Sequence, residues 1–209
     1  MFYWTISNSF FVVRCACKGL LLFIIVSGLY SCDRNYTRTK DLFAIDSLLR
    51  GQVQHLAHHN ASIAKVTTLG NKNNIVTLKP GDTIAWRKEL EIFEALNVIN
   101  KPVNKQRYRV EFHSDIKSNL KVKSFITSDD LSVKYLKIYY EHLPTQMKKI
   151  EASYDESNAL YHSAKVLLLE FEQIRDTSVL TTYSVRGGQK MFLDDTVQYN
   201  IKGTLTLGH

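Results

Sequence analysis

Three histidines within one short segment offer the most suggestive chemistry in the chain. His55, His58 and His59 form the pattern HLAHH, and histidines three or four positions apart on a helix share one face, where they can bind zinc together. No acidic residue or cysteine lies nearby in the sequence to complete a set of ligands. Histidines at the polar end of a helix are more often solvent-facing. We therefore predict no metal and no other cofactor, and keep the zinc site as the alternative.

Two pairs of adjacent acids raise the question of hydrolysis. Asp129-Asp130 and Asp194-Asp195 both stand in segments that we expect to be turns, where Asp is favoured because its side chain bonds to the backbone. Hydrolysis by paired acids requires two carboxylates that face one cleft, and neighbours on a turn do not provide this. The sequence also has no Gly-rich phosphate loop and no Gly-x-Ser-x-Gly elbow. We predict no catalytic residue and rank a hydrolase third among the functions.

Aromatic residues provide the last candidate. Trp86 suggests stacking on a ligand, but its spacing from Leu90 and Phe93 predicts a core position. A second group combines tyrosines with lysines, a pairing that can line a site for an amphipathic lipid or a glycan: Lys134, Tyr135, Lys137, Tyr139 and Tyr140. Plain packing within a sheet is the first interpretation of this group as well. No ligand-binding residue is therefore assigned from the sequence.

The apolar run near the start of the chain is too short to cross a membrane. From Gly19 to Tyr30 it covers 12 residues, or about 18 Å of helix, against about 30 Å of hydrocarbon. A longer helix would bring Arg14 and Lys18 into the membrane, at about 2.5 to 3.5 kcal/mol each near its centre. A cationic flank, a short apolar core and small residues before a cleavage point are typical of a secretory signal.

The segment Leu29-Tyr30-Ser31-Cys32 resembles the lipobox of bacterial lipoproteins. The resemblance implies that the Cys32 thiol is acylated, that cleavage makes Cys32 the first residue, and that its acyl chains hold the protein on a membrane. A buried cysteine closing an uncleaved anchor is the alternative. We predict a signal peptide over residues 1–31, a flexible polar tether over 32–40 and a single domain over 41–209.

The charge of the mature chain is moderately basic. The sequence has 27 Lys and Arg against 20 Asp and Glu, and removing Arg14 and Lys18 leaves 25 against 20. These cations are scattered, without the dense clusters of a nucleic-acid-binding arm. We predict no nucleic-acid partner. A solvated basic surface, or one near anionic lipid head groups, accounts for the surplus.

Periodicity predicts how the domain begins. Apolar residues recur at helical spacing over 41–56, and two β-rich segments, 62–69 and 73–79, flank a turn and predict a hairpin. Asp82 or Thr83 can cap a second helix, in which Trp86, Leu90 and Phe93 share one face while Arg87 and Glu91 pair on another.

From Tyr108 onward the period changes to two, and seven strands follow. They are expected over 108–113, 119–126, 131–140, 146–154, 159–171, 178–185 and 196–207. The fifth also fits a helix, but we predict a strand. Gly187-Gly188 predicts a hairpin turn. The expected fold is α+β: a curved antiparallel meander of about seven or more strands, with two N-terminal helices packed on it.

Several of these motifs together resemble a family of Bacteroidota outer-membrane lipoproteins for which no chemistry is known. The resemblance covers about Cys32 to Gly203. Its motifs are Asp82-Thr83-Ile84-Ala85-Trp86 with Glu89, Leu90 and Phe93, Ile99-Asn100-Lys101-Pro102, Leu160-Tyr161, residues 183–190 and residues 199–203. It implies an outer-membrane lipid anchor, and the tether lacks an acidic stretch, which favours a domain facing the periplasm over the cell surface.

The expected architecture is also similar to periplasmic lipoprotein carriers, which hold acyl chains on a concave sheet. We therefore expect a non-enzymatic binding module for a hydrophobic or amphipathic ligand, such as a lipid or a glycan. The alternative is a structural partner that docks its sheet on another envelope protein.

Overall fold

The computed structural model describes residues 40–191 and 195–208. Residues 41–209 form one compact unit. The predicted signal peptide, Cys32 and nearly all of the predicted tether lie outside the described residues, so these remain predictions. No helix within the described ranges is long and apolar enough to cross a membrane.

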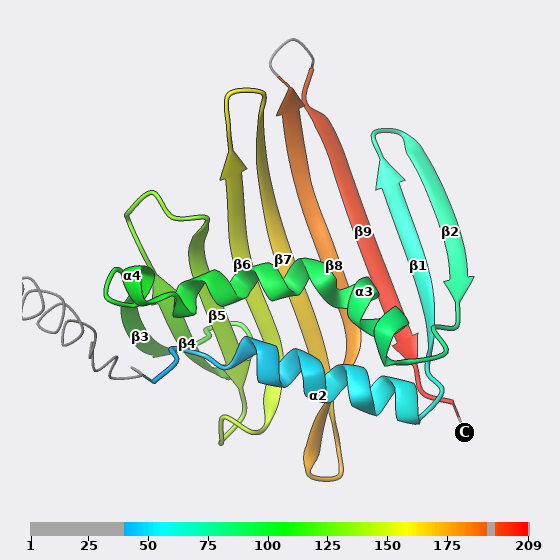
Figure 1. Cartoon of the computed structure of the whole chain (residues 1–209). Coiled ribbons are helices and arrows are strands. Elements are labelled where there is room, and N and C mark those ends of the chain that lie inside the picture. Colours follow the sequence, from blue (N-terminus) through cyan, green and yellow to red (C-terminus); the bar gives the residue numbers. More distant parts are fainter. Residues whose placement is uncertain (1–39, 192–194, 209) are drawn as a thin grey trace, which may run out of the picture. The chain divides into compact units, whose positions relative to one another are not determined.

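A single antiparallel sheet of nine strands dominates the fold (Figure 1). The strands are β1 (Ser62–Leu69), β2 (Lys72–Leu78), β3 (Arg109–Ser114), β4 (Lys121–Ile126), β5 (Val133–Tyr140), β6 (Met147–Ser157), β7 (Tyr161–Ile174), β8 (Thr177–Met191) and β9 (Val197–Thr206). Their order in the sheet is β2-β1-β9-β8-β7-β6-β5-β4-β3, and the sheet is not closed. The predicted antiparallel meander is confirmed, including the strand at β7.

The first hairpin joins the sheet through its last strand. β1 pairs with β9 over its whole length, from Ser62 opposite Thr206 to Leu69 opposite Tyr199. The hairpin and β9 are more than a hundred residues apart in the sequence, so β1 and β9 are the most distant pair of strands joined in the sheet. β2 and β3 are left as the two edges of the sheet.

The helices within residues 40–191 and 195–208 are short. They are α2 (Ile45–His58), α3 (Thr83–Glu94) and α4 (Pro102–Lys105), with a 3₁₀ turn, η2 (Ala95–Asn100), between the last two. Asp82 caps α3 as predicted, because its Oδ1 accepts a hydrogen bond from the backbone N–H of Ala85 at 2.8 Å. The shared face of Trp86, Leu90 and Phe93 is buried, as its spacing predicts.

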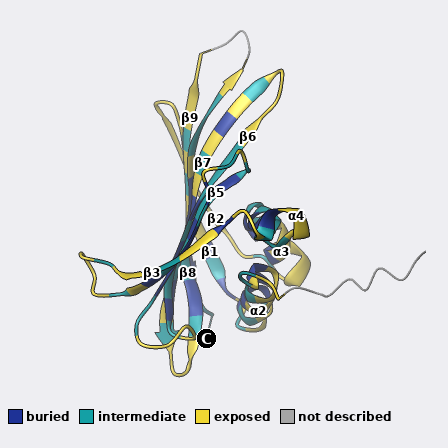
Figure 2. Cartoon of the chain, turned by 90° about the vertical axis from the view of Figure 1, so that its left-hand side faces the viewer, coloured by how far each residue is buried: buried dark blue, intermediate teal, exposed yellow. Residues whose placement is uncertain are grey.

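Both longer helices lie on one side of the sheet, which we call the helix-side face; the opposite side is the far face (Figure 2). Successive side chains of β7 alternate between these two faces. Those on the helix-side face are Leu167, Leu169 and Phe171, which are buried in one core cluster with helix residues such as Leu90 and Phe93. Residues coloured as buried gather where the helices cover the sheet, and the upper ends of the strands are largely exposed (Figure 2).

Gln52 fixes α2 to the sheet. Its side-chain amide donates to the carbonyl oxygen of Ser178 and accepts from the N–H of Leu180, each at 2.8 Å. Both bonds go to β8, and Gln52 is itself buried. A buried amide that meets a strand backbone on both its donor and acceptor sides fixes the position of the helix along that strand.

Two local predictions are wrong. Arg87 pairs with Glu94 instead of Glu91, because its guanidinium can present two parallel bonds, of 2.8 and 3.3 Å, to the Glu94 carboxylate. Gly187 and Gly188 form no turn and lie inside β8. A Cβ on Gly187 would lie 2.4 Å from the carbonyl oxygen of Ala164, so the glycine serves a close approach of two strands.

Candidate functional site

The three histidines do come together, but not as metal ligands. The rings of His55 and His59 have centroids 4.2 Å apart, and those of His58 and His59 are 5.1 Å apart. Burial lowers the pKa of His55, and the charges of His59 and His58 add to this. The described residues contain no group of three or more His, Cys, Asp or Glu placed to hold a metal ion. The zinc alternative therefore gains no geometric support.

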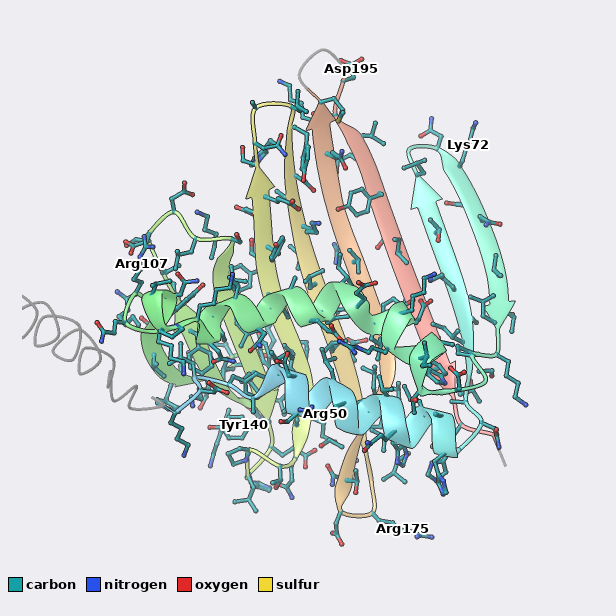
Figure 3. All side chains as sticks on the ribbon, viewed as in Figure 1. Arg50, Lys72, Arg107, Tyr140, Arg175 and Asp195 are labelled. Atoms are coloured by element: carbon teal, nitrogen blue, oxygen red, sulfur yellow. The ribbon has the colours of Figure 1, made fainter. Side chains whose placement is uncertain are left out.

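The acid pairs do not share a cleft within the described residues. Asp129 Oδ2 lies 2.5 Å from Arg107 Nε, and Asp130 Oδ1 lies 3.0 Å from Lys134 Nζ. Each carboxylate thus faces its own cation. Asp195 lies at the tip that joins β8 to β9, far from this turn (Figure 3), and Asp194 is outside the described residues.

The predicted tyrosine and lysine group divides between two environments. Tyr135 and Tyr139 point to the far face with their ring faces already occupied: Lys137 Nζ lies 4.8 Å from the Tyr135 centroid, and Lys149 Nζ lies 3.8 Å from the Tyr139 centroid. Burial raises the pKa of Tyr135 to about 12, helped by Glu151. These contacts favour packing over ligand stacking.

The other two members of that group lie apart from it. Lys134 pairs with Asp130. Tyr140 lies opposite Met147 at the end of β5, beyond a shift in register.

Beneath α3, the helix-side face carries a buried polar contact. The Tyr183 hydroxyl donates a hydrogen bond to Glu89, whose carboxylate lies 2.6 Å from Lys65 Nζ. Burial raises the pKa of Tyr183, and the bond to Glu89 adds to the rise. A Cβ on Gly203 would lie 2.4 Å from the Tyr183 ring, so glycine is required for the ring to pass over β9. This contact joins α3, β1 and β8.

Beyond α3, the helix-side face continues, and no helix of the described residues lies above it (Figure 1). One row of directly paired residues crosses five strands there: Tyr154, Lys165, Gly187, Tyr199 and Leu69. Ile201, Val197 and Met191 lie on the same face of β9 and β8. We call these eight residues the open face.

The open face is mainly apolar, and part of it is exposed. Leu69 is 53% exposed and Val197 is 46% exposed, while Tyr154, Tyr199 and Ile201 pack against the edge of the core. Lys165 provides the cation, with its Nζ 5.3 Å from the Tyr154 centroid and 4.0 Å from Glu156. Such a surface can hold an apolar chain flat against the strands while a lysine meets a polar head group.

Sequence reasoning missed the open face because its residues come from five strands that are distant in the chain. The available signal was Gly187, since a glycine inside a strand often marks a close approach or a bound ligand, but the glycine pair was interpreted as a turn. The candidate site rests on its own geometry, because no family model, no curated protein and no solved structure matches this chain.

Proposed function

We propose that this chain is a lipid-anchored envelope lipoprotein whose sheet is a non-enzymatic binding module for a hydrophobic or amphipathic ligand. In this proposal, acyl chains on Cys32 hold the protein at the outer membrane, with the domain facing the periplasm. The ligand lies on the open face, and α2 and α3 act as a fixed cover over the rest of the helix-side face of a curved sheet.

The observation that carries the proposal is that apolar character continues past the helices. Leu167 and Val185 are buried beneath the cover, and the next row on the same face presents Tyr154, Tyr199 and Leu69. A contiguous apolar surface that extends from the core and stays exposed to water often marks a binding site for a ligand or a protein. The Lys165 and Glu156 pair beside that row favours a ligand that also carries a polar head.

Native mass spectrometry of the full chain, purified in a neutral detergent, tests this function. We expect a co-purifying amphipathic molecule whose occupancy falls in Tyr199→Lys and Leu69→Asp. Ile75→Asp is the matched control, because Ile75 is an exposed apolar residue of β2 on the far face. An empty wild-type protein, or an equal loss in the control, would contradict the proposal.

A second function, docking on another envelope protein, is favoured by the edge strand β2. All seven of its residues are exposed, and no strand pairs with its outer side in the described part of the chain. A free edge with apolar residues such as Ile75 and Val76 invites an added strand. Cross-linking in intact envelopes should then capture a partner through β2. Ile75→Lys should abolish that product, and if it does not, the edge is not the docking site.

A further inference from the structure

The far face of the sheet has a hollow of about 430 Å³ that opens to solvent near the upper ends of β7, β8 and β9. Its floor is the directly opposed pair Ala164 and Gly188. Small side chains on two adjacent strands leave this depression, because neither fills the space above the backbone. The side-chain amide of Gln198 lies over Gly188, since a Cβ on Gly188 would be 2.8 Å from its Nε2 atom and 3.0 Å from its Oε1 atom.

Basic side chains surround this floor. His162 lies directly opposite Lys190, and Arg186 is two residues from Gly188 on the same face of β8. All three are exposed and line the hollow. Arg186 and Lys190 place two cationic side chains on one strand beside the floor, and the His162 ring adds a nitrogen that can donate a hydrogen bond.

The charges of Arg186 and Lys190 are not neutralised within the described part of the chain. Neither side chain has a hydrogen bond or an ion pair there, whereas Lys65, Lys149 and Lys165 in the same sheet each face a carboxylate. The acid nearest to the floor in the strand register is Asp155, opposite Ala164. Its Oδ1 accepts a bond of 3.4 Å from Ser153, and it does not line the hollow.

We infer that this hollow binds a phosphate group. The planar guanidinium of Arg186 can offer two parallel donors to a tetrahedral oxyanion, Lys190 adds a compact charge, and the Gln198 amide adds a neutral donor. Because the Gln198 amide covers Gly188, the anion meets this amide and the two cations over Ala164, and not the strand backbone. The phosphate belongs either to a lipid head group or to a soluble phosphorylated molecule. Lys165 and Gly187 border both the hollow and the open face. The side chains of Arg186, Lys190 and Gln198 project from the far face, so the phosphate site does not rest on the proposed function.

The test follows the backbone amide signals of Gly187 and Gly188 by NMR, with the full chain in a neutral detergent. Inorganic phosphate is titrated while chloride keeps the ionic strength constant. We expect a saturable shift of both signals, and an affinity weaker by about tenfold or more when Arg186→Gln and Lys190→Gln are combined. Lys88→Gln removes one exposed charge from α3 and should leave the affinity unchanged.

A further variant separates shape from charge. Ala164→Leu keeps every cation but fills the space above the floor of the hollow. Because Ala164 is exposed, the fold tolerates the larger side chain. We expect the affinity for phosphate to fall in this variant as well. A wild-type protein that shows no saturable shift with inorganic phosphate, and none with micelles that contain phosphatidic acid, would overturn the inference. So would a loss in Lys88→Gln as large as that in the double variant, because binding would then be non-specific.

Two arms distinguish the sources of the phosphate. Micelles containing phosphatidic acid are compared with micelles containing phosphatidylcholine, and each is compared with inorganic phosphate alone. A shift at Gly188 with phosphatidic acid and not with phosphatidylcholine assigns the site to a lipid head group. A shift with inorganic phosphate alone assigns it to a soluble phosphorylated molecule. A shift in neither arm would refute the site.

Discussion

The helix-side face of the sheet has two regions, one covered by helices and one exposed to solvent. Beneath α2 and α3 it is a dry core, with Tyr183, Glu89 and Lys65 as its polar contact. Beyond α3, the same strands carry the open face, where Leu69 and Val197 remain exposed. In the covered region each side chain is fixed by packing, and in the open region the same alternation leaves apolar side chains without a partner. Stability should therefore depend on the first region and ligand binding on the second.

The largest effect is expected at Gly203. Gly203→Ala places a Cβ 2.4 Å from the Tyr183 ring and 2.8 Å from Ile63 Cδ1, and neither side chain can move freely within the core. We expect a loss of about 3 kcal/mol or failure to fold, measured by urea unfolding.

Gly51→Ala provides the opposite control. The added Cβ meets nothing within 4 Å in α2, so this change should stabilise the protein by about 0.5 to 1 kcal/mol. If Gly203→Ala were as stable as the wild type, the tight contact between β9 and Tyr183 would be refuted.

Gln52→Ala should have the next largest effect. It removes both bonds to β8 and leaves the buried N–H of Leu180 without an acceptor, at a cost of about 2 to 3 kcal/mol. Gln54→Ala changes the same residue type on the exposed side of α2 and should be nearly neutral. Equal unfolding midpoints for the two variants would show that Gln52 does not anchor the helix.

Alkaline pH should cause the next largest loss in the free energy of unfolding. Burial raises the pKa of Tyr108 to about 12, where its hydroxyl donates to the carbonyl oxygen of Val133 at 2.7 Å. The unfolded chain releases this proton near pH 10, so stability is complete below about pH 10 and falls as the pH rises towards 12. The loss is on the order of 2 kcal/mol. Urea midpoints between these values should fall less steeply in Tyr108→Phe than in the wild type.

The smallest effect on stability is expected in the open region. Leu69→Ser alters an exposed side chain and should change the free energy of unfolding by less than about 0.5 kcal/mol, while lowering the occupancy of the amphipathic ligand. A large loss of stability from this substitution would mean that the open face belongs to the core, and the contrast between the regions would disappear.

Local pattern predicted the elements well, and long-range contacts poorly. The period of two identified β3 to β9, and the Asp82 cap located α3, because both signals lie within a few neighbouring residues. The pairing of β1 with β9 has no local signal, so neither the open face nor the hollow could be assembled from the sequence. Gly187 and Gly188 were misread because glycine is favoured both in turns and at close strand contacts.

Photo-crosslinking tests the central claim most directly, using the full chain in neutral detergent and a glycolipid that has a diazirine in its acyl chain and no phosphate group. Successive residues of β9 point to opposite faces, so the labelled positions identify the face that holds the lipid. We predict labels on Val197, Tyr199 and Ile201 and few on Gln198, Asn200 and Lys202. Labels spread evenly over both sets, or confined to the second set, would contradict a ligand site on the open face.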